Sequence, residues 1–75
     1  MATNHEYKTL TNGEKMDASK YAVVGVQVVG GGGAIEGSND GTTWVVATIL
    51  NNVISPCGWK FLRLNGAGTA HLTGK

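Results

Sequence analysis

Residues 34–50 read AIEGSNDGTTWVVATIL, in which a polar block separates two short apolar segments. Asn39 and Asp40 tolerate left-handed backbone angles and hydrogen-bond their own main chain, and Gly41 accepts a positive φ without steric cost. The block therefore predicts a chain reversal at these three residues. Because β-branched residues follow the reversal, the two flanking segments are predicted to pair as an antiparallel hairpin.

A second strand pattern precedes the hairpin, in YAVVGVQVV at residues 21–29. Successive side chains of a strand point to opposite faces. The face that we expect to point into the core carries Ala22, Val24, Val26 and Val28. The opposite face carries Tyr21, Val23, Gly25, Gln27 and Val29. This opposite face is too apolar to be left in water, so we expect another chain to cover it.

Short apolar runs between turn signals predict the other strands. The full set of expected strands is 7–10, 21–29, 34–38, 42–50, 59–65 and 69–73. Asn12-Gly13 and Asn65-Gly66 mark two further turns. Four residues of the last two strands are expected to face inward, namely Leu62, Leu64, Ala70 and Leu72. Arg63 and His71 are expected to point outward.

These patterns define an all-β chain, because no segment keeps helical periodicity for three turns. The expected fold is a small antiparallel β-sandwich or barrel of six to seven short strands. We expect one domain over residues 1–75, in which residues 1–6 form an extended arm.

A domain of 75 residues needs support beyond its own core. Such a domain buries only about 60% of the surface that its unfolded chain exposes. Cys57 is the only cysteine, which excludes an internal disulfide, and no Cys/His cluster predicts a zinc site or another cofactor. We therefore expect self-association, with a closed homotrimer favoured and a dimer as the alternative.

The charge pattern excludes several classes of partner. Six basic and five acidic residues leave a net charge of +1, and no basic run is present to follow a nucleic-acid backbone. No apolar stretch of about 18 residues predicts a membrane span, and the polar start MATNHEYK lacks the apolar core of a signal peptide. We expect a protein made in a reducing cytoplasm, without nucleic-acid or membrane partners.

Motifs that carry chemistry are absent or incomplete. Gly30–Gly33 lacks the Gly-Lys-Ser/Thr ending of a phosphate loop, and we expect a flexible hairpin connection there. Glu36–Gly41 has the opening pattern of a calcium loop, but Ala47 stands where the bidentate acid belongs. Cys57 and His71 are the remaining candidates for a nucleophile and its base, with Cys57 otherwise a small thiol in a turn. We expect no enzymatic activity.

The other polar and aromatic side chains have structural interpretations. The carboxylates expected to be solvated or to cap turns are those of Glu6, Glu14, Asp17, Glu36 and Asp40. Trp44 and Trp59 have two interpretations, a platform for a sugar ring or packing in the core or in a subunit contact. The residues expected at a contact with another subunit or partner are Tyr21, Val23, Val29, Trp44 and Trp59.

The order of these motifs resembles that of the small β-sandwich modules in virion proteins of tailed bacteriophages. The similarity spans roughly residues 9–74, and its most specific parts are Gly37–Trp44 and Trp59–Asn65. The resemblance implies a non-catalytic scaffold, of the kind found in capsid decoration or cement proteins, head fibres, tail fibres and baseplates. A free-standing chain of this length favours the capsid surface. The four-glycine run and Cys57 depart from the pattern.

The resemblance implies a virion structural protein that binds the outer surface of the assembled head and stabilises contacts between capsomers. Its expected partners are further copies of itself and the major capsid protein. The first alternative is a tail, collar or baseplate component. The second is a carbohydrate-binding module for host attachment, in which Trp44 or Trp59 stacks on the sugar and Asn39 or Asp40 supplies polar contacts.

Overall fold

The computed structural model describes residues 5–49 and 51–75. Eight short strands run through these residues, and all of their pairings are antiparallel. The strands are β1 (Glu6–Thr11), β2 (Lys15–Asp17), β3 (Val24–Val29), β4 (Ala34–Ser38), β5 (Val45–Ile49), β6 (Asn52–Ile54), β7 (Phe61–Asn65) and β8 (Thr69–Gly74).

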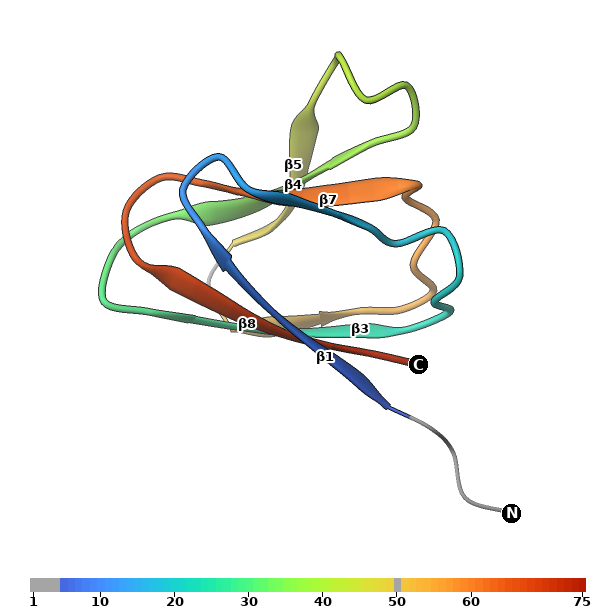
Figure 1. The fold of residues 1–75 in the computed structure, drawn as a ribbon, viewed down its shortest axis with the longest axis horizontal. Coiled ribbons are helices and arrows are strands. Elements are labelled where there is room, and N and C mark those ends of the chain that lie inside the picture. Colours follow the sequence, from blue (N-terminus) through green and yellow to red (C-terminus); the bar gives the residue numbers. More distant parts are fainter. Residues whose placement is uncertain (1–4, 50) are drawn as a thin grey trace.

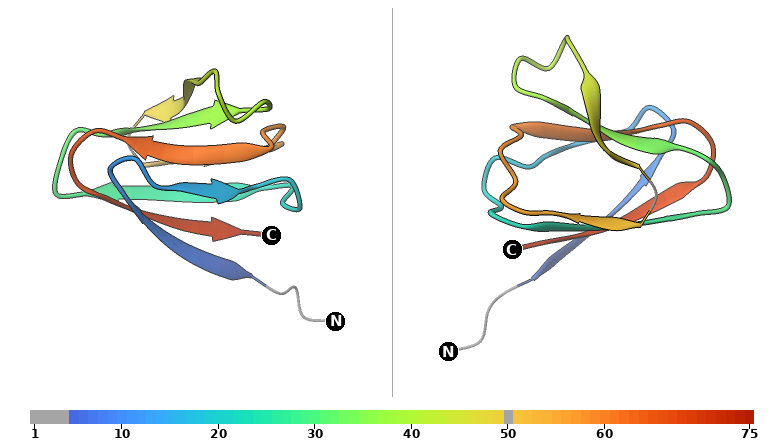
Figure 2. Two further views of the ribbon diagram at one scale, coloured as in Figure 1. Left: turned by 45° about the horizontal axis from the view of Figure 1, so that its top comes forward. Right: turned by 180° about the vertical axis from the view of Figure 1, so that it is seen from behind.

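The strands form two sheets of four, which lie face to face as two layers (Figure 1). Sheet A has the order β1-β8-β3-β6, and sheet B has the order β2-β7-β4-β5. The view from behind shows the same two layers, with β5 rising from one side of the molecule (Figure 2). The expected all-β class and the sandwich alternative are confirmed, with eight strands in place of the expected six to seven.

The core lies between the sheets and is built from alternate residues of the central strands. The fully or almost fully buried apolar residues are Leu10, Met16, Ala18, Val24, Val26, Val28, Ile35, Leu62, Leu64, Ala70 and Leu72. The inward placement expected for the residues of β7 and β8 is therefore confirmed. Three of the four residues assigned to the core face of 21–29 are buried, but the assignment of Ala22 was wrong, because Ala22 is exposed.

Ala22 is exposed because the strand begins later than expected. The amides of Ala22 and Val23 both donate to the carbonyl of Lys75, at 2.8 and 3.1 Å, and regular pairing in β3 starts at Val24. The strand expected at 42–50 likewise begins only at Val45, because the amides of Thr42 and Thr43 donate to the Asp40 carboxylate in the preceding turn. Leu50, the last residue of that expected strand, lies outside the described residues.

The two additional strands, β2 and β6, are three residues long and mostly exposed. Met16 is the only buried residue of β2, which leaves too little alternation to mark a strand in the sequence. At the N-terminus, Glu6 already pairs with Gly74, so the expected arm over 1–6 is wrong at this position. Residues 1–4 of that arm lie outside the described residues.

The four-glycine run connects β3 in sheet A to β4 in sheet B, so the expected hairpin connection was wrong. The Gly33 amide donates to the carbonyl of Ala67 at 3.1 Å. A Cβ added to Gly31 would lie 2.4 Å from the Ala67 backbone, and a Cβ added to Gly68 would lie 2.6 Å from the Val29 carbonyl oxygen and 3.0 Å from the Gly31 nitrogen. The two loops at this end of the sandwich therefore pack main chain against main chain.

The reversal after β4 has the expected geometry. Gly41 has a φ of +77°, and the Ser38 hydroxyl accepts the Gly41 amide at 2.9 Å. The Asp40 carboxylate accepts the amides of Thr42 and Thr43, each at 2.8 Å. The predicted turn and the predicted pairing of its flanking strands, β4 and β5, are both confirmed.

We expect Gly41→Val to lower the free energy of unfolding by about 1 to 3 kcal/mol, because a β-branched residue is poorly tolerated at positive φ. The Phe61 ring lies 3.5 Å from the position of an added Cβ, an ordinary contact, so the backbone angle and not crowding is expected to cause the loss. Gly41→Asn is the matched control, since asparagine enters the left-handed region more readily. Urea unfolding at fixed protein concentration measures both variants, and equal losses would contradict the role assigned to φ.

Candidate functional site

The two outward faces of the sandwich differ in charge. The outward face of sheet B carries Lys15 and Arg63 beside Glu36, in neighbouring positions of β2, β7 and β4. Arg63 donates to Glu36 through Nε at 2.8 Å and lies 2.7 Å from it through a terminal nitrogen. The guanidinium of Arg63 also stacks over the ring of Trp44, 4.3 Å from its centroid. This face therefore carries an ion pair, Arg63 with Glu36, and a further cation, Lys15.

The outward face of sheet A carries no Asp, Glu, Lys or Arg in the part of the chain that the structure describes. Strand register places its side chains in three rows across β1, β8 and β3, with β6 at the side. These residues, which we call the uncharged face, are Tyr7, Thr9, Thr11, Gly25, Gln27, Val29, Val53, Thr69, His71 and Thr73. Covering such a face buries no Asp, Glu, Lys or Arg side chain, and its hydroxyl and amide groups need hydrogen-bond partners in the contact.

A shallow hollow of about 400 Å³ lies in the uncharged face above Gly25. Its other lining residues include Gln27, Asn52, Val53 and Thr73. Gly25 has no positive φ, and a Cβ added there would meet only ordinary contacts, the nearest at 3.9 Å. Glycine within a strand is unfavourable and often marks a close approach by another group. The fold itself does not require glycine at this position.

The edges of the two sheets are also unequal. Glu6 and Lys8 lie on edge strand β1, and Lys15 and Asp17 lie on edge strand β2. Charges on edge strands discourage pairing with other chains. Edge strands β5 and β6 lie within a stretch, residues 41–59, that contains no charged residue. Their valines are strongly exposed, with Val45 at 49%, Val46 at 55% and Val53 at 58%. We call β5 and β6 the open edge.

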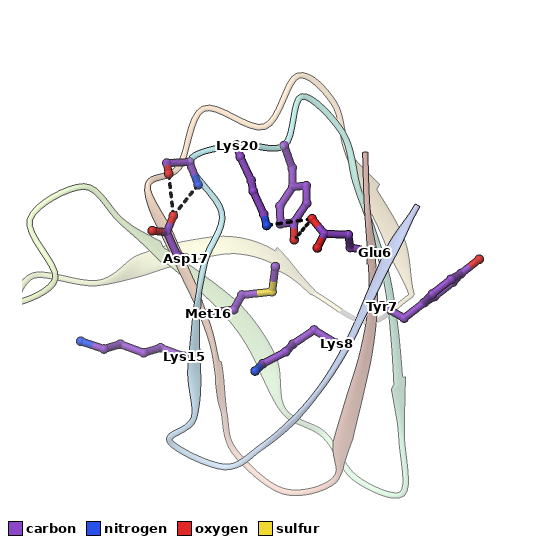
Figure 3. A pocket seen from close by; sticks show the side chains of 9 residues that line it. Glu6, Tyr7, Lys8, Lys15, Met16, Asp17 and Lys20 are labelled. Carbon is purple, nitrogen blue, oxygen red and sulfur yellow. Dashed lines mark hydrogen bonds and ion pairs between the residues drawn. The ribbon is translucent and has the colours of Figure 1, made fainter. Parts of the chain in front are cut away.

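A hollow with charged walls lies between β1 and β2 (Figure 3). Glu6 Oε1 lies 2.9 Å from Lys20 Nζ and accepts the Tyr21 hydroxyl at 2.9 Å. The Asp17 carboxylate accepts both the amide and the hydroxyl of Ser19, at 2.9 and 2.6 Å. Both carboxylates of this hollow are thus engaged by their own neighbours, and the hollow contains no pair of unengaged acids.

Hydrogen bonds lower the pKa of several carboxyl groups. The amides of Thr42 and Thr43, with the Ser38 hydroxyl, hold the pKa of Asp40 far below its ordinary value. The Ser19 hydroxyl and amide lower the pKa of Asp17. The expected capping role is therefore confirmed for these two acids, whereas Glu36 lies within a strand and pairs with a cation.

Stability should fall in acid, because carboxyl groups with a lowered pKa in the fold stabilise it only while they are ionised. The loss begins near the unfolded-state pKa, about 4, and grows as pH falls further through the folded-state values. Asp40→Asn imitates the protonated form, so it should lower the melting temperature at neutral pH and approach the wild type at low pH. Calorimetry over this pH range measures the difference, and a difference that stays constant with pH would contradict the assignment.

The structure disperses the residues that the sequence assigned to one contact surface. Tyr21 and Val23 precede β3 and are half-buried, and the Tyr21 ring covers Gly74. Val29 lies on the uncharged face. Trp44 stacks with Arg63 on the outside of sheet B.

Trp59 packs against the core and over Gly37, on the inner side of sheet B. The sequence analysis did not identify Tyr7 or the valines of the open edge as surface features. The charge-free stretch 41–59 was the signal that could have revealed the open edge.

Cys57 and His71 lie on different sides of sheet A. Cys57 packs against the core, and its amide donates to the carbonyl of Ala22 at 2.7 Å. His71 points outward from β8 and contacts the Thr9 hydroxyl at 3.3 Å through Nδ1. Within residues 5–49 and 51–75, no group of three His, Cys, Asp or Glu side chains is placed to hold a metal ion. The same residues contain no helix long and apolar enough to cross a membrane.

Comparisons with known proteins add no identification. No protein-family model matches the chain, and neither a curated protein nor a solved structure is significantly similar to it. The candidate site is therefore defined by this structure alone, as an uncharged surface made of one sheet face and one open edge.

Proposed function

We propose that this chain is a non-enzymatic structural protein of a tailed-phage virion that binds the outer surface of the assembled head. The observation that carries the proposal is the open edge, where exposed valines and unprotected strand edges meet in a charge-free stretch. An edge strand offers a row of backbone donors and acceptors to a neighbouring chain, and the valines add apolar contact. Together with the resemblance of the motifs, this favours a binding protein over an enzyme.

Under this proposal, the open edge contacts the major capsid protein at sites that exist only after assembly. A ligand that binds only the assembled lattice stabilises it by mass action, by about 2.7 kcal/mol per site when its free concentration is 100 times Kd. Many equivalent sites on one head multiply this effect. The protein would be made in the host cytoplasm and carried on the virion.

Co-sedimentation with purified heads of the parent particle tests the proposal, with unassembled capsid protein as the comparison. We expect binding to heads alone, and we expect Val46→Lys on the open edge to lose it, because a buried ammonium without a partner is strongly disfavoured. Lys15→Glu, a charge reversal on the opposite edge, is the control and should still bind. Failure of the wild type to bind heads, or full binding by Val46→Lys, would overturn the proposal.

The alternatives predict other outcomes of related experiments. Binding to isolated tails or baseplates, without binding to heads, would favour the tail, collar or baseplate role. Glycan binding that Trp44→Ala abolishes while leaving the fold intact would favour a carbohydrate-binding module, although Arg63 already covers one face of that ring.

We expect the purified chain to show no hydrolase, transferase or nuclease turnover. Reproducible turnover that Cys57→Ala or His71→Ala abolishes would contradict the non-enzymatic assignment.

A further inference from the structure

We infer that the uncharged face binds the same face of a second copy of this chain, forming a two-fold dimer in which Tyr7 of each copy enters the hollow above Gly25 of the other. This inference concerns the purified chain and does not depend on the proposed virion role. The contact includes Gly25, Gln27 and Val29 of the face that the sequence predicts another chain to cover, but it has two-fold symmetry in place of the favoured trimer.

The first support is that a projecting residue, Tyr7, and a recessed residue, Gly25, lie in the same row of the uncharged face. Tyr7 is 77% exposed on β1, and Figure 3 shows its side chain pointing away from the neighbouring charged hollow. Strand register places Tyr7 opposite Thr73 of β8, and Thr73 opposite Gly25 of β3. Tyr7 and Gly25 therefore lie on either side of Thr73, each one strand spacing of about 4.8 Å away.

This spacing makes the face complementary to itself. We place a two-fold axis parallel to β8, just above Thr73. Rotation about this axis brings β1 of each copy over β3 of the other copy. Tyr7 of one copy then stands over Gly25 of the other, and the reverse contact forms by symmetry, as a two-fold interface requires. In the next rows, Thr9 meets Gln27, and Thr11 meets Val29.

The chemistry of the hollow fits a tyrosine side chain. Gly25 and Val53 offer apolar surface to the ring, while the side chains of Gln27 and His71, which line the same hollow, offer polar partners for the hydroxyl. Tyrosine is enriched at interfaces because it combines a large apolar ring with one polar group. Packed sheets lie about 10 Å apart, a gap that a side chain as long as tyrosine can bridge.

The lack of charged side chains permits this contact, and the area of the uncharged face limits the affinity of the dimer. A face that meets its own copy brings like charges together, and the uncharged face has none of the four ordinarily charged residue types. Three strands of six residues and one of three give a footprint of at most about 20 by 20 Å. That footprint lies below the roughly 800 Å² per partner of a standard stable interface, so the dimer should dissociate reversibly in the micromolar to submillimolar range.

Sedimentation velocity over this concentration range tests the inference on the full-length chain. The wild type should shift from monomer to dimer as concentration rises. Gly25→Val fills the hollow with a side chain that the monomer has room for, so it should weaken dimerisation at least tenfold while the melting temperature in the monomeric range is unchanged or raised. Tyr7→Ser should weaken dimerisation similarly, and Tyr7→Phe should retain most of it.

Val46→Ser, which removes a comparably exposed side chain from the open edge, is the control and should leave the dimer intact. A second measurement locates the contact directly: Tyr7→Cys chains mixed with Gly25→Cys chains, both in a Cys57→Ser background, should be joined into covalent dimers by a bismaleimide that spans the gap of about 10 Å between packed sheets. A monomer at all concentrations, a trimer, or a dimer unaffected by Gly25→Val would overturn the inference.

Discussion

Gly31→Ala is expected to lower the free energy of unfolding by about 3 kcal/mol, the upper part of the range for forcing extra atoms into packed structure. The added methyl would lie 2.4 Å from the carbonyl carbon and oxygen of Ala67 and 2.7 Å from the Gly68 nitrogen. These neighbours are backbone atoms, so they cannot move aside by rotating a side chain. The glycine loops that join the two sheets would have to separate.

In a domain of this size, a loss of that magnitude corresponds to a melting temperature lower by about 12 to 24 °C. Gly32→Ala is the control, because no atom lies within 4 Å of the added methyl and the residue has no positive φ. Its melting temperature should stay the same or rise slightly, since alanine restricts the unfolded chain. Equal effects of the two substitutions would show that the loops do not pack as described.

Gly37→Ala is expected to displace the Trp59 ring and to lower the free energy of unfolding by about 2 kcal/mol. The added methyl would lie 2.3 to 2.7 Å from three atoms of the indole. The ring is half-buried, so it can escape toward water, and this limits the loss compared with a clash between backbones. Trp59 fluorescence, isolated in a Trp44→Phe background, should shift to longer wavelength.

A double-mutant cycle gives the decisive control for this contact. In a Trp59→Ala background, Gly37→Ala should cost less than about 0.5 kcal/mol, because the atoms it meets have been removed. Gly58→Ala, next to the tryptophan in sequence but without an atom within 4 Å of the added methyl, should be neutral. A loss that persists without the indole would assign the effect to the strand itself.

Local sequence patterns determined the fold class, the turns and most of the core faces. The alternation of Val24, Val26 and Val28 marks an inward face because opposite orientation of successive side chains is a property of any strand. The positive φ of Gly41 follows from turn chemistry that needs only its immediate neighbours. Predictions of this kind succeeded because each depends on a few adjacent residues.

The limits of the strands were set by contacts with distant residues. Ala22 was expected in the core, but its amide is held by Lys75, more than fifty positions away, and β3 starts after it. β2 is a strand because it pairs with β7, although its own residues show almost no pattern. Pairing with distant strands decides where these segments begin as strands, so their boundaries could not be predicted from the local sequence.

The alternation in 21–29 already placed Gly25, Gln27 and Val29 on one face, but the tertiary structure decided how far the candidate interaction surface extends beyond that strand. Gly31 and Gly32 are identical neighbours in the sequence, yet of these two only Gly31 packs against another loop, because the crossing of the chain between the sheets brings Ala67 to Gly31 and Gly33, on either side of Gly32. Tyr7, Thr73 and Gly25 likewise share one row only because β8 pairs with both β1 and β3. The sequence determined that these residues are uncharged, and strand register determined that they form one face.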